Sequence, residues 1–206
     1  MKKVINLIKN SLNSNKKFIY FLLLFSLLGI VAGSLFVLFL NNSDKTIVIN
    51  YITDFINNIK NNKINLYNNF ISLYLPNMFN TMLIWVLGIS IIAVPIILFI
   101  YFSKMFVLGF TVASFILKYK FMGVIYCFLY LFPVCIIEIL IYLVLINYSF
   151  TLSLNLFKSF FKKGNINFKP IMKRYVFILL LTLLILFLTS LFEVTISPII
   201  LRFILK

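Results

Sequence analysis

The chain contains uncharged apolar runs that are as long as a lipid bilayer is thick. Residues 18–40 include no charged residue in 23 consecutive positions, and a helix needs about 20 apolar residues to cross a hydrocarbon core of roughly 30 Å. Of the 206 residues, 63% are hydrophobic and 11% are charged, whereas a soluble domain has about 25% charged residues. The composition therefore excludes a soluble enzyme, a DNA-binding module and a secreted disulfide scaffold. It predicts an all-α, polytopic membrane helix bundle.

We expect about five transmembrane helices in a single integral membrane domain, residues 1–206. The predicted spans are approximately 18–40, 82–102, 105–117, 124–157 and 175–197. The third is either a short span or a re-entrant helix, because it is shorter than a bilayer crossing normally requires. The fourth is long enough for one tilted helix, kinked near Pro133, or for a hairpin of two helices.

The distribution of basic residues predicts the topology. The chain has 19 lysine and arginine residues against four acidic residues, a net charge of +15. The basic residues lie between the apolar runs, which is typical of loop charges that set orientation and contact anionic lipids, not of nucleic-acid binding. Five lysines precede the first run and six basic residues lie in 158–174, so both segments are expected in the cytoplasm. Five spans then place the N-terminus inside and the C-terminus outside, with Lys104 counted as a further cytoplasmic loop charge.

The segment 41–75 is the predicted outer, extracytoplasmic piece, and its apolar residues fall on one helical stripe while most of its asparagines lie elsewhere. We expect an amphipathic helix. It rests on the headgroups or packs on its own spans, or it forms a docking surface for extracytoplasmic partners. The docking candidates are Ile52, Phe55, Ile56, Ile59, Tyr67 and Phe70.

Glu138 is an acidic residue in the interior of an apolar run. An unpaired charge there is costly, so such a residue is a functional hypothesis by default. At 100° per residue, Glu138, Tyr142, Ser149 and Ser153 share one helix face. This face lines an ion or proton pathway if the protein is a transporter. Otherwise Glu138 is protonated or hydrogen-bonded and serves to pack the bundle.

Residues with catalytic or metal-binding chemistry are scarce. The sequence has no histidine and two cysteines, and it contains no P-loop, no zinc-protease motif and no serine-hydrolase motif. Cys127 and Cys135 are eight positions apart, about 12 Å along a helix, which is too far for a disulfide. We therefore expect no catalytic residues, no metal site and no cofactor.

Glycine and proline residues mark expected points of close helix packing or of kinks. Gly29 and Gly33 form a G-x-x-x-G pattern in the first span, which allows close helix contact either within the bundle or between copies in a homo-oligomer. The other positions expected to pack or kink helices are Gly88, Pro95, Gly109, Pro133 and Glu138.

Several stretches resemble the stage II sporulation protein M family, in order and spacing over nearly the whole chain. The order of Gly88, Pro95, Gly109-Phe110-Thr111 and Pro133 is the most specific part of the resemblance. The matching stretches are 79–95, 107–112, Leu131-Phe132-Pro133, Ser149-Phe150-Thr151-Leu152-Ser153, Phe160-Phe161-Lys162-Lys163 and Ser197-Pro198. Two positions depart from the family pattern: Ala93 stands where the family often has Gly, and Val134 stands where some branches have His.

The resemblance implies a bacterial cell-membrane protein of the sporulation septum and the engulfing mother-cell membrane. It implies a non-enzymatic scaffold that helps to place two extracytoplasmic peptidoglycan hydrolases, an amidase/endopeptidase and a lytic transglycosylase. The alternative from another class is a membrane transporter or an ABC-type permease subunit that uses the polar face around Glu138.

Overall fold

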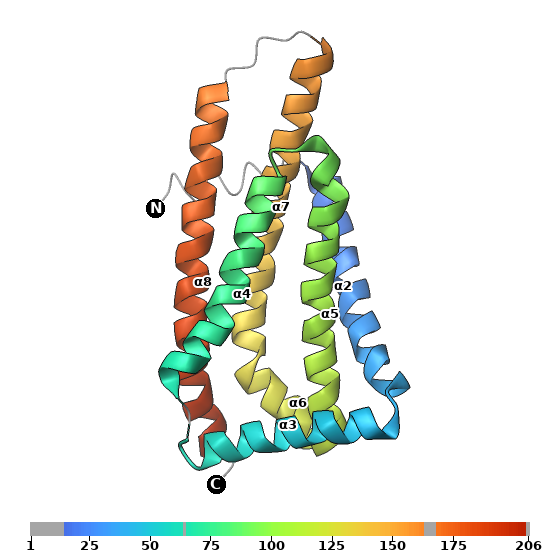
Figure 1. Cartoon of the computed structure of the whole chain (residues 1–206), viewed down its shortest axis with the longest axis vertical. Coiled ribbons are helices and arrows are strands. Elements are labelled where there is room, and N and C mark those ends of the chain that lie inside the picture. Colours follow the sequence, from blue (N-terminus) through green and yellow to red (C-terminus); the bar gives the residue numbers. More distant parts are fainter. Residues whose placement is uncertain (1–14, 64, 163–167, 205–206) are drawn as a thin grey trace.

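The computed structural model describes residues 15–63, 65–162 and 168–204, and nearly all of these residues are helical (Figure 1). Five of the described helices are long and apolar enough to cross a membrane. They are α2 (Lys16–Phe39), α4 (Leu66–Leu87), α5 (Val94–Tyr119), α7 (Phe132–Lys162) and α8 (Phe168–Ile204). The expected all-α, polytopic membrane bundle of about five spans is confirmed.

Three shorter helices connect the spans. Helix α3 (Asn42–Lys60) lies across one end of the bundle, where α2, α5 and α8 also end, and α6 (Phe121–Tyr130) lies at the same end (Figure 1). The single 3-10 turn η1 (Ile91–Ala93) joins α4 to α5 at the opposite end. We call these the α3 end and the basic end, because lysine and arginine residues of α2, α7 and α8 gather at the latter.

Residues 82–117 are divided into helices differently from the prediction. Helix α4 ends at Leu87 with Gly88 as its cap, and Pro95 lies in the first turn of α5. Proline is tolerated in a first turn, where its missing N–H has no helical partner anyway, so it starts a helix here and does not kink one. The predicted span 82–102 is therefore wrong, and the predicted short or re-entrant helix 105–117 is the second half of one full-length crossing.

The predicted outer segment 41–75 is also too long. It contains α3 but also the first turns of α4, which begins at Leu66. Four asparagines, Asn68, Asn69, Asn77 and Asn80, make α4 the least apolar of the five spans. Hydropathy alone therefore assigned the first part of this span to the outside.

The stretch predicted as 124–157 crosses once. Helix α6 ends at Tyr130, and Pro133 is the second residue of α7, so the chain breaks between two helices at this point instead of kinking one. The short helix α6, at 10 residues, lies at the α3 end before the single crossing by α7. The predicted basic loop 158–174 is largely helix, because α7 continues to Lys162 and α8 begins at Phe168.

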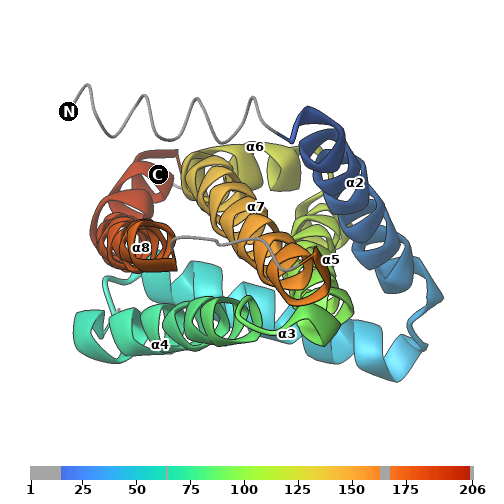
Figure 2. The same cartoon turned by 90° about the horizontal axis from the view of Figure 1, so that it is seen from above.

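Helices α2 and α5 make the most extensive contact of any helix pair, and they lie side by side in Figure 2. A Cβ atom on Gly33 would lie 2.0 Å from the carbonyl oxygen of Phe106, and one on Gly109 would lie 2.0 Å from that of Ile30. The Ser34 hydroxyl donates a hydrogen bond across the interface to the Gly109 carbonyl, at 3.1 Å. The G-x-x-x-G pattern of α2 thus lies against α5 within the same chain.

Helix α3 is fixed at both of its ends. The Lys45 ammonium donates to the carbonyl of Leu38 at the end of α2, at 3.1 Å. Arg202 of α8 donates through Nε to the carbonyl of Ile59 at 3.1 Å and through Nη2 to Asn62 Oδ1 at 2.7 Å. These side chains satisfy carbonyl groups that the helix ends leave without an intrahelical donor.

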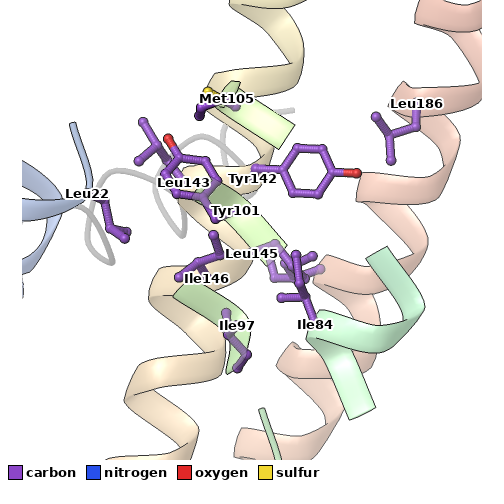
Figure 3. Packing of buried hydrophobic residues seen from close by; sticks show 11 residues of the cluster. Leu22, Ile84, Ile97, Tyr101, Met105, Tyr142, Leu143, Leu145, Ile146 and Leu186 are labelled. Atoms are coloured by element: carbon purple, nitrogen blue, oxygen red, sulfur yellow. The ribbon is translucent and has the colours of Figure 1, made fainter. Parts of the chain in front are cut away.

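The main core lies between the long helices, at the middle of the bundle (Figure 3). Its fully buried members include Leu22, Ile84, Tyr101, Met105, Tyr142 and Leu186. All five long helices contribute residues to this cluster, so none of the five is peripheral to the main core.

The placement of charge supports a topology that we test by labelling. With Cys127 and Cys135 replaced by Ser, we introduce cysteine at Lys60, Lys118 or Lys173. The excess of basic residues at the basic end predicts that this end is cytoplasmic. A membrane-impermeant maleimide should label positions 60 and 118 on intact cells and position 173 only after permeabilisation. Labelling of position 173 on intact cells would contradict this orientation.

Because α2 and α5 approach so closely, we expect one methyl group added at Gly33 to lower the stability of the protein. Gly33→Ala places a Cβ against the backbone of α5, and overpacking of this kind costs about 1–3 kcal/mol. We expect a lower midpoint of unfolding in a mixed-micelle SDS titration. The control is Val31→Ile, which adds one methyl group at a half-exposed position of the same helix. Equal stability of the two variants would show that α2 and α5 do not pack as described.

Candidate functional site

A buried ion pair joins α5 to α7. The Lys104 ammonium lies 2.9 Å from Glu138 Oε2, and the two side chains are 15% and 11% exposed. An isolated charge at this depth would be costly, and pairing with hydrogen bonds is the usual way in which membrane proteins keep one. Lys104 is therefore an intramembrane residue, and its assignment to a cytoplasmic loop was wrong.

Asn77 of α4 connects to both members of the pair. Its Nδ2 donates to Glu138 Oε1 at 2.9 Å, and its Oδ1 accepts from the Lys104 ammonium. The same ammonium lies 4.5 Å from the ring centroid of Tyr142, where the ring face attracts a cation. The Tyr142 hydroxyl donates to the Asn77 carbonyl at 3.2 Å. Lys104 of α5 therefore contacts residues of both α4 and α7. We call Asn77, Lys104, Glu138 and Tyr142 the polar cluster.

A cavity of about 700 Å3 lies beside the polar cluster, toward α3. Asn77, Lys104 and Glu138 form part of its wall, and Tyr51 and Phe55 of α3 line it at the α3 end. Most of the other lining residues are apolar. The cavity therefore combines a charged wall with hydrophobic surroundings, as small-molecule sites often do.

Glu193 of α8 is a second buried acid on this cavity. The whole Glu193 residue is 8% exposed, the same fraction as the whole Glu138 residue, and it lines this cavity. The sequence analysis placed a single acid, Glu138, in the interior of an apolar run, and the structure adds a second. Glu193 stands close to the end of the predicted span 175–197, and it was not predicted as a member of the site.

A second group of polar contacts caps α4 at the basic end of the bundle. The Ser153 hydroxyl donates to the carbonyl of Gly88 at 2.7 Å, and the Tyr175 hydroxyl donates to the carbonyl of Trp85 at 2.8 Å. Ser149 and Tyr175 hydroxyls lie 2.9 Å apart. A Cβ on Gly88 would lie 2.2 Å from the Tyr175 hydroxyl oxygen, so only glycine leaves room for this arrangement. The polar contacts satisfy the last carbonyls of α4 inside the bundle.

The helix face that was predicted from periodicity is buried along its whole length. Glu138, Tyr142, Ser149 and Ser153 are each 8% exposed or less. The face divides into two parts, since its first two residues belong to the polar cluster and its last two cap α4. Asn77 and Lys104 were not predicted as members of the site.

The docking candidates on α3 face the wrong way for a partner. Ile52, Ile56 and Ile59 are 8%, 4% and 1% exposed. The Phe55 ring packs edge-on against Phe115 and Tyr130, with centroids 6.2 and 5.3 Å away. Helix α3 is amphipathic because its apolar stripe packs on its own bundle. The prediction that these four residues dock a partner is therefore wrong.

The two remaining docking candidates belong to α4. Tyr67 is 72% exposed, whereas the Phe70 ring packs against Phe187 of α8 at 5.4 Å. Phe70 is therefore part of the bundle surface that α4 and α8 share. Tyr67 is the one member of the predicted docking set whose side chain is free to meet another molecule.

The chemistry available at the cavity is that of charge, hydrogen bonding and apolar contact. Within the described ranges, no three His, Cys, Asp or Glu side chains form a group that could hold a metal ion. Cys127 and Cys135 are free thiols. The arrangement can hold a polar or charged group inside the membrane and can couple the positions of α4, α5 and α7.

Together, the fold and the polar cluster define a polytopic helical membrane protein whose spans are joined by an intramembrane ion pair. A comparison with protein families matches residues 21–198 to the family described as Stage II sporulation protein M. The chain belongs to this family, which confirms the resemblance noted in the sequence, and it is a sporulation-related membrane protein. No curated protein and no solved structure matches the chain.

The ion pair predicts a non-additive response to mutation. Lys104→Met leaves Glu138 without its cation, and breaking a buried pair in this way costs about 3–5 kcal/mol. Adding Glu138→Gln to the same chain should recover part of the loss, because no uncompensated charge remains. The measurement is an SDS titration in mixed micelles of the single and double variants.

The control for this cycle is Lys118→Met, which removes an exposed lysine from the same helix and should change the unfolding free energy by less than about 0.5 kcal/mol. If the double variant loses the sum of the two single losses, Lys104 and Glu138 do not interact as the geometry indicates.

Proposed function

We propose that the protein is a non-enzymatic membrane scaffold for sporulation engulfment, which recruits and positions extracytoplasmic peptidoglycan hydrolases. The observation that carries the proposal is the position of α3. This helix lies across the end of the bundle that the charge distribution predicts to be external (Figure 1), and Ile47, Asp54 and Asn58 along its outer side are exposed.

The outer face of α3 has the character of a docking surface. Ile47, Asp54 and Asn58 are exposed and fall within 40° of one another on the helix, opposite the buried isoleucines. We call these three residues the outer stripe. Lys45 and Arg202 fix the helix at its two ends, so the stripe is presented on a rigid element and not on a loop.

The acidic residues are divided between two environments. Asp44 and Asp54 are exposed on α3, whereas Glu138 and Glu193 are buried in the bundle. The outer face of α3 thus carries both exposed carboxylates of a chain that is otherwise strongly basic. A partner with a basic patch would be favoured there, since complementary charge steers association and fixes register.

The expected partners are an amidase/endopeptidase and a lytic transglycosylase, at the sporulation septum and the engulfing mother-cell membrane. These follow from the family to which the chain belongs. The sequence has no histidine, and no group of metal-ligating side chains occurs in the part of the chain that the structure describes. Both facts support a role in which the partners supply the chemistry.

A transporter or ABC-type permease subunit is the second candidate. The observation that favours it is the cavity of about 700 Å3 beside the Lys104–Glu138 pair. Intramembrane charges on a water-accessible cavity mark ion or substrate pathways in many transporters. In that case Glu138 would act on a transported species, and the outer stripe would have no essential role.

One experiment separates the two candidates. A triple variant, Ile47→Ser with Asp54→Lys and Asn58→Lys, alters the outer stripe without changing the buried face of α3. In sporulating cells, we expect it to reduce septal enrichment of fluorescently tagged hydrolases about tenfold, because loss of central contacts commonly weakens an interface by that much. Glu138→Gln is made together with Lys104→Met, so that no unpaired charge remains in the bundle, and this double variant should leave enrichment nearly unchanged.

The control variant replaces two exposed lysines at the other end, Lys169→Ser with Lys173→Ser. Immunoblots of membrane fractions must show equal amounts of each variant. Normal recruitment by the triple variant, together with loss of engulfment in the Lys104→Met, Glu138→Gln double variant, would favour the transporter and contradict the scaffold.

A further inference from the structure

Glu193 is a buried carboxyl group that has no protein partner. The whole residue is 8% exposed and lines the large cavity. Within the described ranges, it accepts no hydrogen bond and forms no ion pair. A buried carboxylate without a partner is strongly disfavoured, so the cavity wall lacks a positively charged or hydrogen-donating group at this point.

Lys104 does not supply that group. Its ammonium is occupied by Glu138 Oε2 at 2.9 Å, by Asn77 Oδ1 and by the face of Tyr142. The other oxygen of Glu138 is occupied by Asn77 Nδ2. Both oxygens of Glu138 and the Lys104 ammonium are thus engaged within the polar cluster, whereas Glu193 is the acidic group on the cavity without a partner.

Two prolines leave backbone carbonyls without a helical donor in the smaller cavity that adjoins the large one. A proline has no N–H to donate to the carbonyl four residues earlier. Pro76 therefore offers none to the carbonyl of Ser72, and Pro198 offers none to that of Val194, the residue after Glu193. Ser72 and Val194 line a smaller cavity of about 240 Å3, which shares Phe55 with the large one.

Most of the remaining cavity wall is apolar, and the cavity reaches the lipid-facing surface. Phe99 and Val107 line it and are 69% and 60% exposed. In Figure 1, α4 leans away from α5 toward the α3 end. A volume of about 700 Å3 is far larger than a metal ion requires and falls within the range of organic ligands.

We infer that this cavity binds the primary ammonium group of an amphiphile, with the nitrogen at Glu193 and the apolar part against the walls between α4 and α5. A primary ammonium has one positive charge, which matches the single unpartnered carboxylate, and three N–H donors, of which those not used by Glu193 are left for water or for carbonyl groups of the adjoining smaller cavity. The source is either the headgroup of phosphatidylethanolamine or a free aliphatic amine. The inference concerns the interior of the bundle and is independent of docking at the outer stripe.

The test uses the full chain in a non-ionic detergent and n-octylamine as the probe. Octylamine should raise the midpoint of thermal unfolding in a saturable manner, whereas 1-octanol, which has the same chain and no charge, should not. In Glu193→Gln, the octylamine concentration for the half-maximal shift should rise about tenfold, because a charge-assisted hydrogen bond is lost. The control variant, Asp54→Asn, removes an exposed acid of α3 and should respond like the wild type.

A second variant keeps the test decisive if Glu193→Gln does not fold. Leu108→Trp fills part of the cavity and leaves the carboxyl group in place, so it should abolish the octylamine shift. An equal shift in wild type and Glu193→Gln, an equal shift with 1-octanol, or a full shift in Leu108→Trp would each overturn the proposal.

Lipid nanodiscs distinguish the two sources. Nanodiscs of phosphatidylglycerol alone are compared with nanodiscs that also contain phosphatidylethanolamine. If the lipid headgroup is the native ligand, phosphatidylethanolamine weakens the response to octylamine that depends on Glu193. If a free amine is the ligand, that response is the same in both membranes.

Discussion

The interaction on which the rest of the structure depends is the ion pair between Lys104 and Glu138. In hydrocarbon neither charge is stable alone, so the pair fixes the rotation of α5 against α7, and Asn77 adds α4 to the same contact. On another side of α5, Gly109 permits the backbone of α2 to approach within contact distance. Helix α5 is therefore held by charge on one side and by close backbone packing on another, and the remaining spans are arranged around it.

The fold class and the approximate number of spans could be predicted because backbone N–H and C=O groups find no water in the bilayer core. A long apolar run must therefore satisfy them within itself, as an α-helix does. The boundaries between residues 66 and 119 could not be predicted. Pro95 looks the same in sequence whether it begins a helix or kinks one, and only the packed structure shows that it begins α5. The asparagines at the start of α4 lower its hydropathy, although Asn77 is inside the bundle and forms part of the polar cluster.

The site could be predicted only in part. Periodicity grouped Glu138, Tyr142, Ser149 and Ser153 correctly on one buried face, since they belong to one helix and depend on one angle. Lys104 was missed because a lysine between two apolar stretches has the pattern of a loop charge. The same kind of ambiguity left two interpretations of α3 open, because an apolar stripe can pack on the protein's own spans or on a partner. The structure shows this stripe packed on its own bundle.

The account thus separates an interior that holds the spans together from an outer helix face that is free to meet other proteins. Its central claim is tested most directly by site-specific photocrosslinking in sporulating cells, with the photoreactive residue at Asp54 on the outer face of α3 or at Leu28 on the exposed side of α2. The account predicts a covalent adduct with a peptidoglycan hydrolase from position 54 and none from position 28. An abundant, properly inserted protein that yields no hydrolase adduct from position 54 would contradict it.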